Sequence, residues 1–81
     1  MPKPRKSLFS EAYVLTIERL IARRRELGMT QVDVATAYGE DQSFISRVER
    51  RQRRIDVCEF VRFCRILALD PGEILRGLPD A

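Results

Sequence analysis

Helix start and stop signals divide this chain into short segments, and they constrain its fold more than any other feature of the sequence. Residues that commonly cap helices, such as Ser10 and Thr30, precede runs in which apolar residues recur every three or four positions. Gly28 and Gly39 follow two of these runs, at positions where helices commonly end. Apolar and polar residues do not alternate with a period of two, so we expect no β-sheet. The sequence therefore predicts an all-α fold.

Five helices follow from these signals. Their predicted ranges are residues 11–27, 31–38, 42–50, 57–68 and 71–76. The clearest start signal is Asp70-Pro71-Gly72-Glu73, which combines a capping acid, a proline at the first helical position and a glutamate at the third. Asp41 and Asp56 are the corresponding capping residues of the third and fourth helices.

Size and composition exclude several classes of function. The 81 residues are enough for one domain with a small core. The chain has no His, the commonest general base and zinc ligand, and its two Cys alone cannot build a usual zinc site. We therefore expect no enzyme activity, no metal and no cofactor. The longest apolar run is far shorter than the ~18 residues that span a membrane, so we expect a soluble, cytoplasmic protein.

The two cysteines lie six residues apart on the predicted fourth helix. A helix rises ~1.5 Å per residue, which separates Cys58 and Cys64 by more than a disulfide allows. We interpret both as small buried hydrophobic residues. A redox sensor or a disulfide between subunits is the alternative.

Charge is distributed unevenly along the chain. Residues 1–54 carry 12 basic and 7 acidic side chains, a net charge of +5, whereas residues 55–81 carry 3 and 5, a net charge of −2. This division favours a polyanion-binding surface in the first part, with ordinary scatter over a solvated surface as the alternative. Residues 1–9 are predicted to be a flexible basic arm. Its Lys3, Arg5 and Lys6 either contact the polyanion or form an uncommitted tail.

The second and third predicted helices carry the functional signal. They are short, and only Gly39-Glu40-Asp41 joins them, with a glycine that permits the positive φ needed to set two helices at a steep angle. Such a pair can hold its second helix in a DNA major groove. Phe44 on that helix either touches a thymine methyl group or the sugar backbone, or folds back to shield the turn. The predicted base contacts are Gln42, Ser43, Phe44, Ser46 and Arg47.

The string GMTQVDVATAYGEDQSFISRVERRQRRIDV resembles the helix-turn-helix of the Cro/repressor (XRE) family of bacterial and phage DNA-binding proteins, and LDPGEIL resembles that family's final helix. Arg51 stands where the family usually has Gly, and Asp41 stands where it usually has Ser or Thr. The resemblance covers about residues 10–76. The residues that match in order and spacing are Gly28, Thr30, Gln31, Val34, Ala35, Gly39, Gln42, Ser43, Ile45, Ser46, Val48 and Glu49.

The resemblance implies a compact five-helix, lambda-repressor-like domain over residues 10–78, encoded by a bacterium or a phage and associated with the nucleoid. It also implies a buried ion pair between Arg24 and Glu49, whose loss would cost ~3–5 kcal/mol. Gln31 falls on a position that binds a DNA phosphate and braces the recognition helix. The full set of expected phosphate contacts is Gln31, Arg50, Arg51, Arg53 and Arg54.

The resemblance further implies a sequence-specific transcriptional regulator that binds a palindromic operator as a homodimer. Phage Cro-like repressors and the controllers of restriction–modification systems are similar in build. We expect dimerisation through residues 57–78, although the same apolar side chains can instead complete the core. A protein-interaction module, such as an antitoxin or adaptor, is the alternative function. No small-molecule ligand is expected. The predicted interface residues are Ile66, Leu69, Ile74, Leu75 and Leu78.

Overall fold

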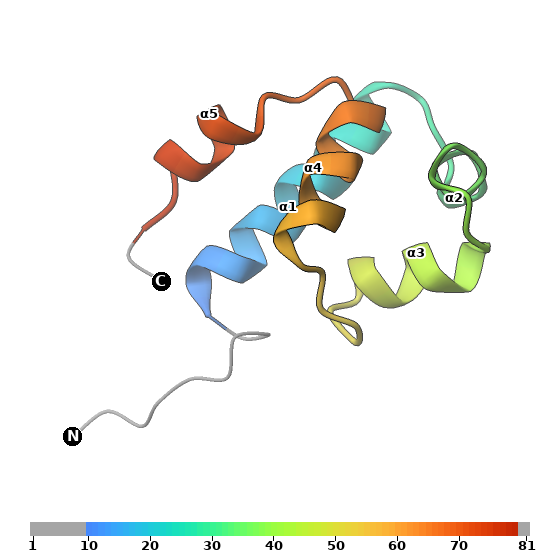
Figure 1. Ribbon diagram of the computed structural model, residues 1–81, viewed down its shortest axis with the longest axis horizontal. Helices are drawn as coiled ribbons and strands as arrows, with labels where there is room; N and C mark the ends of the chain where they lie inside the picture. Colours follow the sequence, from blue (N-terminus) through green and yellow to red (C-terminus); the bar gives the residue numbers. More distant parts are fainter. Residues whose placement is uncertain (1–9, 80–81) are drawn as a thin grey trace.

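The computed structural model describes residues 10–79, and these residues form five α-helices and no strand. In Figure 1, α2 is seen nearly end-on while α3 runs across the view. α5 lies on the side of α1 and α4 that faces away from α2 and α3. The all-α prediction is therefore confirmed. The first, third and fourth helices end one or two residues before their predicted ends. The helices are α1 (Glu11–Glu26), α2 (Gln31–Tyr38), α3 (Gln42–Glu49), α4 (Val57–Ile66) and α5 (Pro71–Arg76).

The predicted capping residues begin each helix. Thr30 and Asp33 form a reciprocal capping box at the start of α2, and Asp56 and Glu59 form another at the start of α4. The Asp41 side chain accepts the backbone N–H of residue 44 and so begins α3. Because these side chains satisfy N–H groups that would otherwise lack a partner, the short helices have defined start points.

Four helices end in the same way, although only two of them end with glycine. The left-handed residues that follow α1, α2, α3 and α4 are Gly28, Gly39, Arg51 and Ala68, with φ values of 69°, 88°, 58° and 53°. After α3, the Gln52 N–H donates to the Arg47 carbonyl oxygen at 2.8 Å, which is the long hydrogen bond of a Schellman motif. The position of Arg51 thus demands a left-handed backbone, which explains why the family usually has glycine there.

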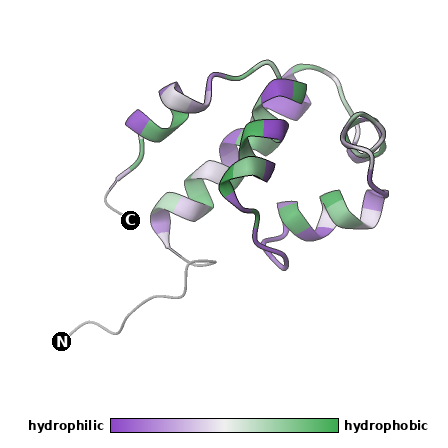
Figure 2. Ribbon diagram, viewed as in Figure 1, coloured by the Kyte–Doolittle hydropathy of each residue, from purple (hydrophilic) through white to green (hydrophobic). Residues whose placement is uncertain are grey.

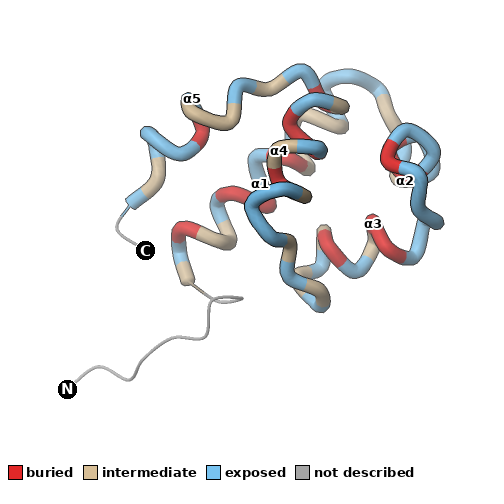
Figure 3. The backbone as a smooth tube through the Cα atoms, in the orientation of Figure 1, coloured by how far each residue is buried: buried red, intermediate tan, exposed pale blue. Residues whose placement is uncertain are grey.

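The core lies where α1 to α4 converge, and α5 contributes Ile74. Figure 2 shows hydrophobic and hydrophilic residues on different sides of the helices, and Figure 3 shows buried and exposed stretches alternating along α1, α3 and α4. An aromatic cluster joins three helices, with the Tyr38 ring 5.2 Å from Phe44 and 4.8 Å from Phe63. Phe44 is only 6% exposed. The expectation that Phe44 faces DNA is therefore wrong, because its ring completes the core.

The predicted dimer residues divide into two groups. Ile74 belongs to the core, while Ile66 and Leu69 are partly buried against it. These three side chains pack within the chain, as the alternative interpretation proposed, whereas Leu75 stays 56% exposed and Leu78 is half-buried. Ile74 was thus wrongly assigned to a surface, because a short helix with one buried face needs an apolar residue there.

The remaining expectations concern the two cysteines, membrane-spanning helices and the predicted arm. Cys64 is buried, as predicted, whereas Cys58 is exposed and is not the buried residue that we expected. No helix within residues 10–79 is long and apolar enough to cross a membrane. The predicted arm at residues 1–9 lies outside the described residues.

Candidate nucleic-acid interface

The outward face of α3 is an open, polar depression. The turn that precedes α3 contains Gly39, whose φ of 88° directs the chain away from α2. Four of the five predicted base contacts lie together in the depression, and only Phe44 is missing. Gln52, which sequence reasoning did not single out, joins them because the Schellman motif folds it back toward α3. The depression is lined by Gln42, Ser43, Ser46, Arg47, Arg50 and Gln52.

Hydrogen bonds order the first turn of this face. The Ser43 hydroxyl donates to Asp41 Oδ1 at 2.7 Å, and the Phe44 N–H donates to the same oxygen at 3.0 Å. These bonds, the Ser43 bond first, hold the pKa of the Asp41 carboxyl below its ordinary value. The hydroxyl hydrogen is therefore used within the protein, and Ser43 presents acceptor lone pairs to the outside.

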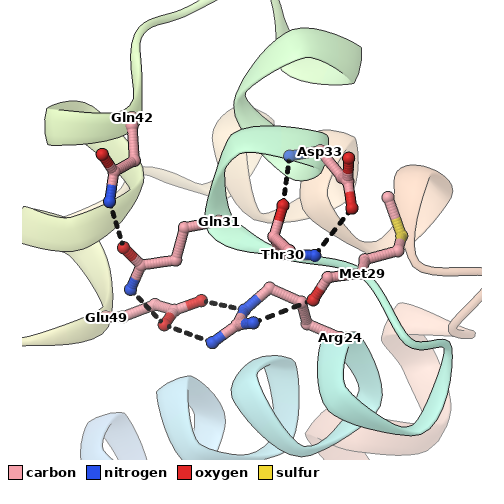
Figure 4. Close-up of polar contacts among 7 residues, drawn as sticks. All are labelled: Arg24, Met29, Thr30, Gln31, Asp33, Gln42 and Glu49. Carbon is pink, nitrogen blue, oxygen red and sulfur yellow. Dashed lines mark hydrogen bonds and ion pairs between the residues drawn. The ribbon is translucent and has the colours of Figure 1, made fainter.

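A chain of polar contacts connects the interior to the start of α3 (Figure 4). Arg24 Nε donates to Glu49 Oε2 at 2.7 Å and Arg24 Nη2 donates to Glu49 Oε1 at 3.0 Å. Gln31 Nε2 donates to the same Oε1 at 2.9 Å, and Gln42 Nε2 donates to Gln31 Oε1 at 3.1 Å. Arg24 Nη1 also donates to the Met29 carbonyl oxygen at 2.9 Å. The chain thus ends on Gln42 at the α3 surface.

The arginines after α3 differ in their surroundings. Arg50 and Arg54 are exposed, whereas Arg51 and Arg53 are half-buried. Arg53 makes two contacts with Glu59, at 3.0 and 3.1 Å, and its guanidinium lies 4.7 Å from the centre of the Phe44 ring. The Arg53 contacts and the Asp56 N–H hold the pKa of the Glu59 carboxyl below its ordinary value. Arg53 therefore joins the loop to α4, a structural role that spacing alone did not reveal.

Two further arginines bind carbonyl oxygens at helix ends. Arg62 Nη2 donates to the Tyr38 carbonyl oxygen at 2.6 Å, and its guanidinium lies 4.1 Å from the Tyr38 ring centre. Arg23 Nε donates to the Leu67 carbonyl oxygen at 2.9 Å. Such bonds compensate the last carbonyl groups of α2 and α4. No sequence signal marks them, because each joins segments that are far apart in the chain.

Comparisons with known proteins agree with this geometry. A helix-turn-helix family model matches residues 20–74, which is more than half of the chain. A solved structure of an XRE-family like protein from Pseudomonas syringae pv. tomato str. DC3000 is similar, with 38% sequence identity and a TM-score of 0.76. The match covers 80% of this chain and 79% of that chain. A comparison with curated proteins returns no match. The chain therefore belongs to the XRE family of helix-turn-helix proteins, which are DNA-binding regulators whose fold is typically non-enzymatic.

Proposed function

We propose that the protein is a sequence-specific transcriptional regulator that reads the major groove of double-stranded DNA with α3, as a homodimer on a palindromic operator. The observation that carries this proposal is the depression on α3, where amide, hydroxyl and guanidinium groups converge on an open surface. An α-helix fits the major groove, and these are the side chains that discriminate base edges there. Cytoplasmic location follows from this role.

Each polar side chain on this face suits one kind of base contact. Gln42 is exposed and has a donor and an acceptor for adenine. Arg47 is exposed one turn later and can bind guanine through two N–H groups. Ser43 offers an acceptor to a base donor, and the half-buried Ser46 allows close approach of the helix to the bases.

Phosphate binding is assigned first to the exposed arginines. Arg50 lines the depression and Arg54 is exposed in the segment that follows α3, so α3 can enter the groove while their charges meet the DNA backbone. Gln31, next to the α3 start, is the phosphate-binding amide. Arg51 and Arg53 are less exposed, and Arg53 already has Glu59 as a partner, so their contributions to phosphate binding are smaller.

The homodimer is supported by an apolar groove beside the basic loop, residues 50–56, which joins α3 to α4. Val57 is 77% exposed and Leu75 is 56% exposed, and both line this groove with Tyr13, Ile55 and Phe60. Val57 begins α4 directly after the loop. A two-fold axis near Val57 therefore brings the two loops together between the half-sites and buries both exposed side chains. Within the interface predicted at residues 57–78, Leu75 keeps its role, and Val57 replaces Ile74.

Selection of bound sequences from a random duplex library tests the function, combined with sedimentation to determine the mass in solution. We expect a palindromic site with half-sites about one helical turn apart. Arg47→Ala is expected to lose preference at one base pair of each half-site, by about 1–3 kcal/mol, and to keep the remaining preferences. If the wild-type protein enriches no sequence, the regulator assignment is wrong, and a protein-interaction module such as an antitoxin becomes the better interpretation.

A further inference from the structure

We infer that Glu49 is a specificity-determining positioning residue: through Gln31 it fixes the direction of the Gln42 side-chain amide and thereby sets Gln42 to recognise adenine. The inference rests on the proposed function, because it requires α3 to read bases. It assigns to Glu49 a role beyond its ion pair with Arg24. Glu49 lies at the last position of α3, seven residues from the amide that it controls.

The chemistry of the Glu49 carboxylate sets the direction of the Gln31 side-chain amide. Glu49 has a side chain that is only 14% exposed, and it is held by two hydrogen bonds from Arg24. An ionised carboxylate can accept hydrogen bonds but cannot donate them. Gln31, which lies 2.9 Å from Glu49 Oε1, must therefore turn its NH₂ group toward Glu49. The reverse orientation would set the amide oxygen against the carboxylate.

The second amide follows from the first. With its nitrogen on Glu49, Gln31 directs its oxygen toward Gln42, which donates to it through Nε2 at 3.1 Å. Figure 4 shows the two amides and the carboxylate in this order. If the Gln42 amide were rotated by half a turn, its oxygen would face the oxygen of the Gln31 amide. The Glu49 carboxylate thus determines which end of the Gln42 amide faces Gln31, although Glu49 and Gln42 do not bond to each other.

A fixed amide direction has a consequence for base recognition. Gln42 keeps Oε1 and one N–H of Nε2 for an external partner. Adenine offers N6–H as a donor and N7 as an acceptor, in a fixed order along its major-groove edge. Guanine offers two acceptors at that edge. An amide that cannot rotate matches the adenine order in one direction only, so Glu49 should set the preference at the base pair that Gln42 reads.

The experiment compares base preferences in a random duplex library for five proteins. Gln42→Ala identifies the base pair that Gln42 reads. Glu49→Gln replaces the acceptor-only group by an amide that can face either way, and Gln31→Met removes the link while keeping the Arg24–Glu49 pair. Glu59→Gln is the matched control, because it also exchanges a carboxylate for an amide and weakens an arginine ion pair, but it has no contact with Gln31 or Gln42.

The wild-type protein should prefer adenine at the Gln42 base pair by about 5- to 150-fold, the range of a good bidentate contact. Glu49→Gln and Gln31→Met should reduce that preference to about twofold, leaving preferences at the Arg47 base pair intact. Loss of a phosphate contact by Gln31 would lower affinity for all sequences equally and would not change this ratio. Glu59→Gln should keep the adenine preference.

The outcomes separate the inference from the proposed function. Full adenine preference in Gln31→Met overturns the inference alone, and Gln31→Met decides the matter if Glu49→Gln does not fold. Loss of the preference in Glu59→Gln as well also overturns it, since any weakened ion pair would then have the same effect. A wild-type protein that enriches no sequence refutes the proposed function instead.

Discussion

Replacing Arg51 by glycine is expected to stabilise the protein, although it removes a charged side chain beside the recognition helix. Arg51 has a φ of 58°, and its Nε is buried without a hydrogen-bond partner within residues 10–79. A non-glycine residue in the left-handed region costs about 1–2 kcal/mol, and the entropy that glycine loses on folding takes back about 0.5–1 kcal/mol. The net gain from the backbone is about 1 kcal/mol.

The assay is thermal and urea unfolding, followed by the helical circular dichroism signal. Arg51→Ala is the matched control, because it removes the side chain and keeps the strained backbone. Arg51→Gly should unfold at a temperature about 4–8 °C above that of Arg51→Ala, the shift that 1 kcal/mol gives in a domain of this size. Ala68 has a φ of 53° and an exposed side chain, so Ala68→Gly should show the same gain over the wild type.

Equal stability of Arg51→Gly and Arg51→Ala would refute the assignment of strain to the left-handed backbone. A gain at residue 68 alone would show instead that the loop after α3 relaxes to accommodate arginine. The same variants test the phosphate role expected for Arg51. A wild-type salt dependence of DNA binding in Arg51→Gly would remove Arg51 from the phosphate contacts.

Three further predictions concern the loop, the groove and acid stability. Arg50→Ala should weaken binding to all sequences alike and reduce the slope of log K against log salt by ~0.9, with an unchanged unfolding temperature. Arg53→Ala should instead lower the unfolding temperature. Calorimetry measures the unfolding temperature, and DNA binding at several salt concentrations measures the slope. Val57→Glu should yield monomers in sedimentation, because the two-fold axis would oppose like charges, while Val32→Glu, on the exposed face of α2, should not. The pKa of Glu59 is lowered in the folded state from an ordinary value of 4.5, so its stabilising contribution is complete above pH 4.5 and is lost as the pH falls through the lower folded value; thermal unfolding of Glu59→Gln should therefore depend less on pH in that acidic range.

Local signals predicted the helices well because each start is encoded within four residues. Thr30 with Asp33, and Asp56 with Glu59, form the reciprocal hydrogen bonds that their spacing indicates. The ends were less predictable. α4 stops at Ile66, and the exposed Ala68 adopts a left-handed conformation that its residue type does not favour. Tertiary packing sets that end, and a pattern read along one helix does not contain it.

Only part of the candidate site was predicted from the sequence, because the rest depends on contacts between helices. Polar residues on α3 were placed from helical spacing, and four of the five share one surface. The orientation of Phe44 depended on whether Tyr38 and Phe63 leave room for its ring, which only the packed structure determines. The roles of Arg53 and Arg62 depend on partners in other helices. Ile74 is buried and not at the surface, because α5 is short and presents one residue to the core, and no sequence signal singled out the exposed Val57.

Because guanidinium groups bind helix-end carbonyl oxygens, arginine and lysine are not interchangeable at these positions. Every basic residue within the described part of the chain is arginine, and the two lysines, Lys3 and Lys6, precede it. Arg62 stacks on a ring and donates to a carbonyl at once, which an ammonium group cannot do. Sequence drift from arginine to lysine would preserve the net charge of +3 and the attraction to DNA. It would nonetheless be counter-selected at residues 23, 24 and 62, where the cation holds helices together.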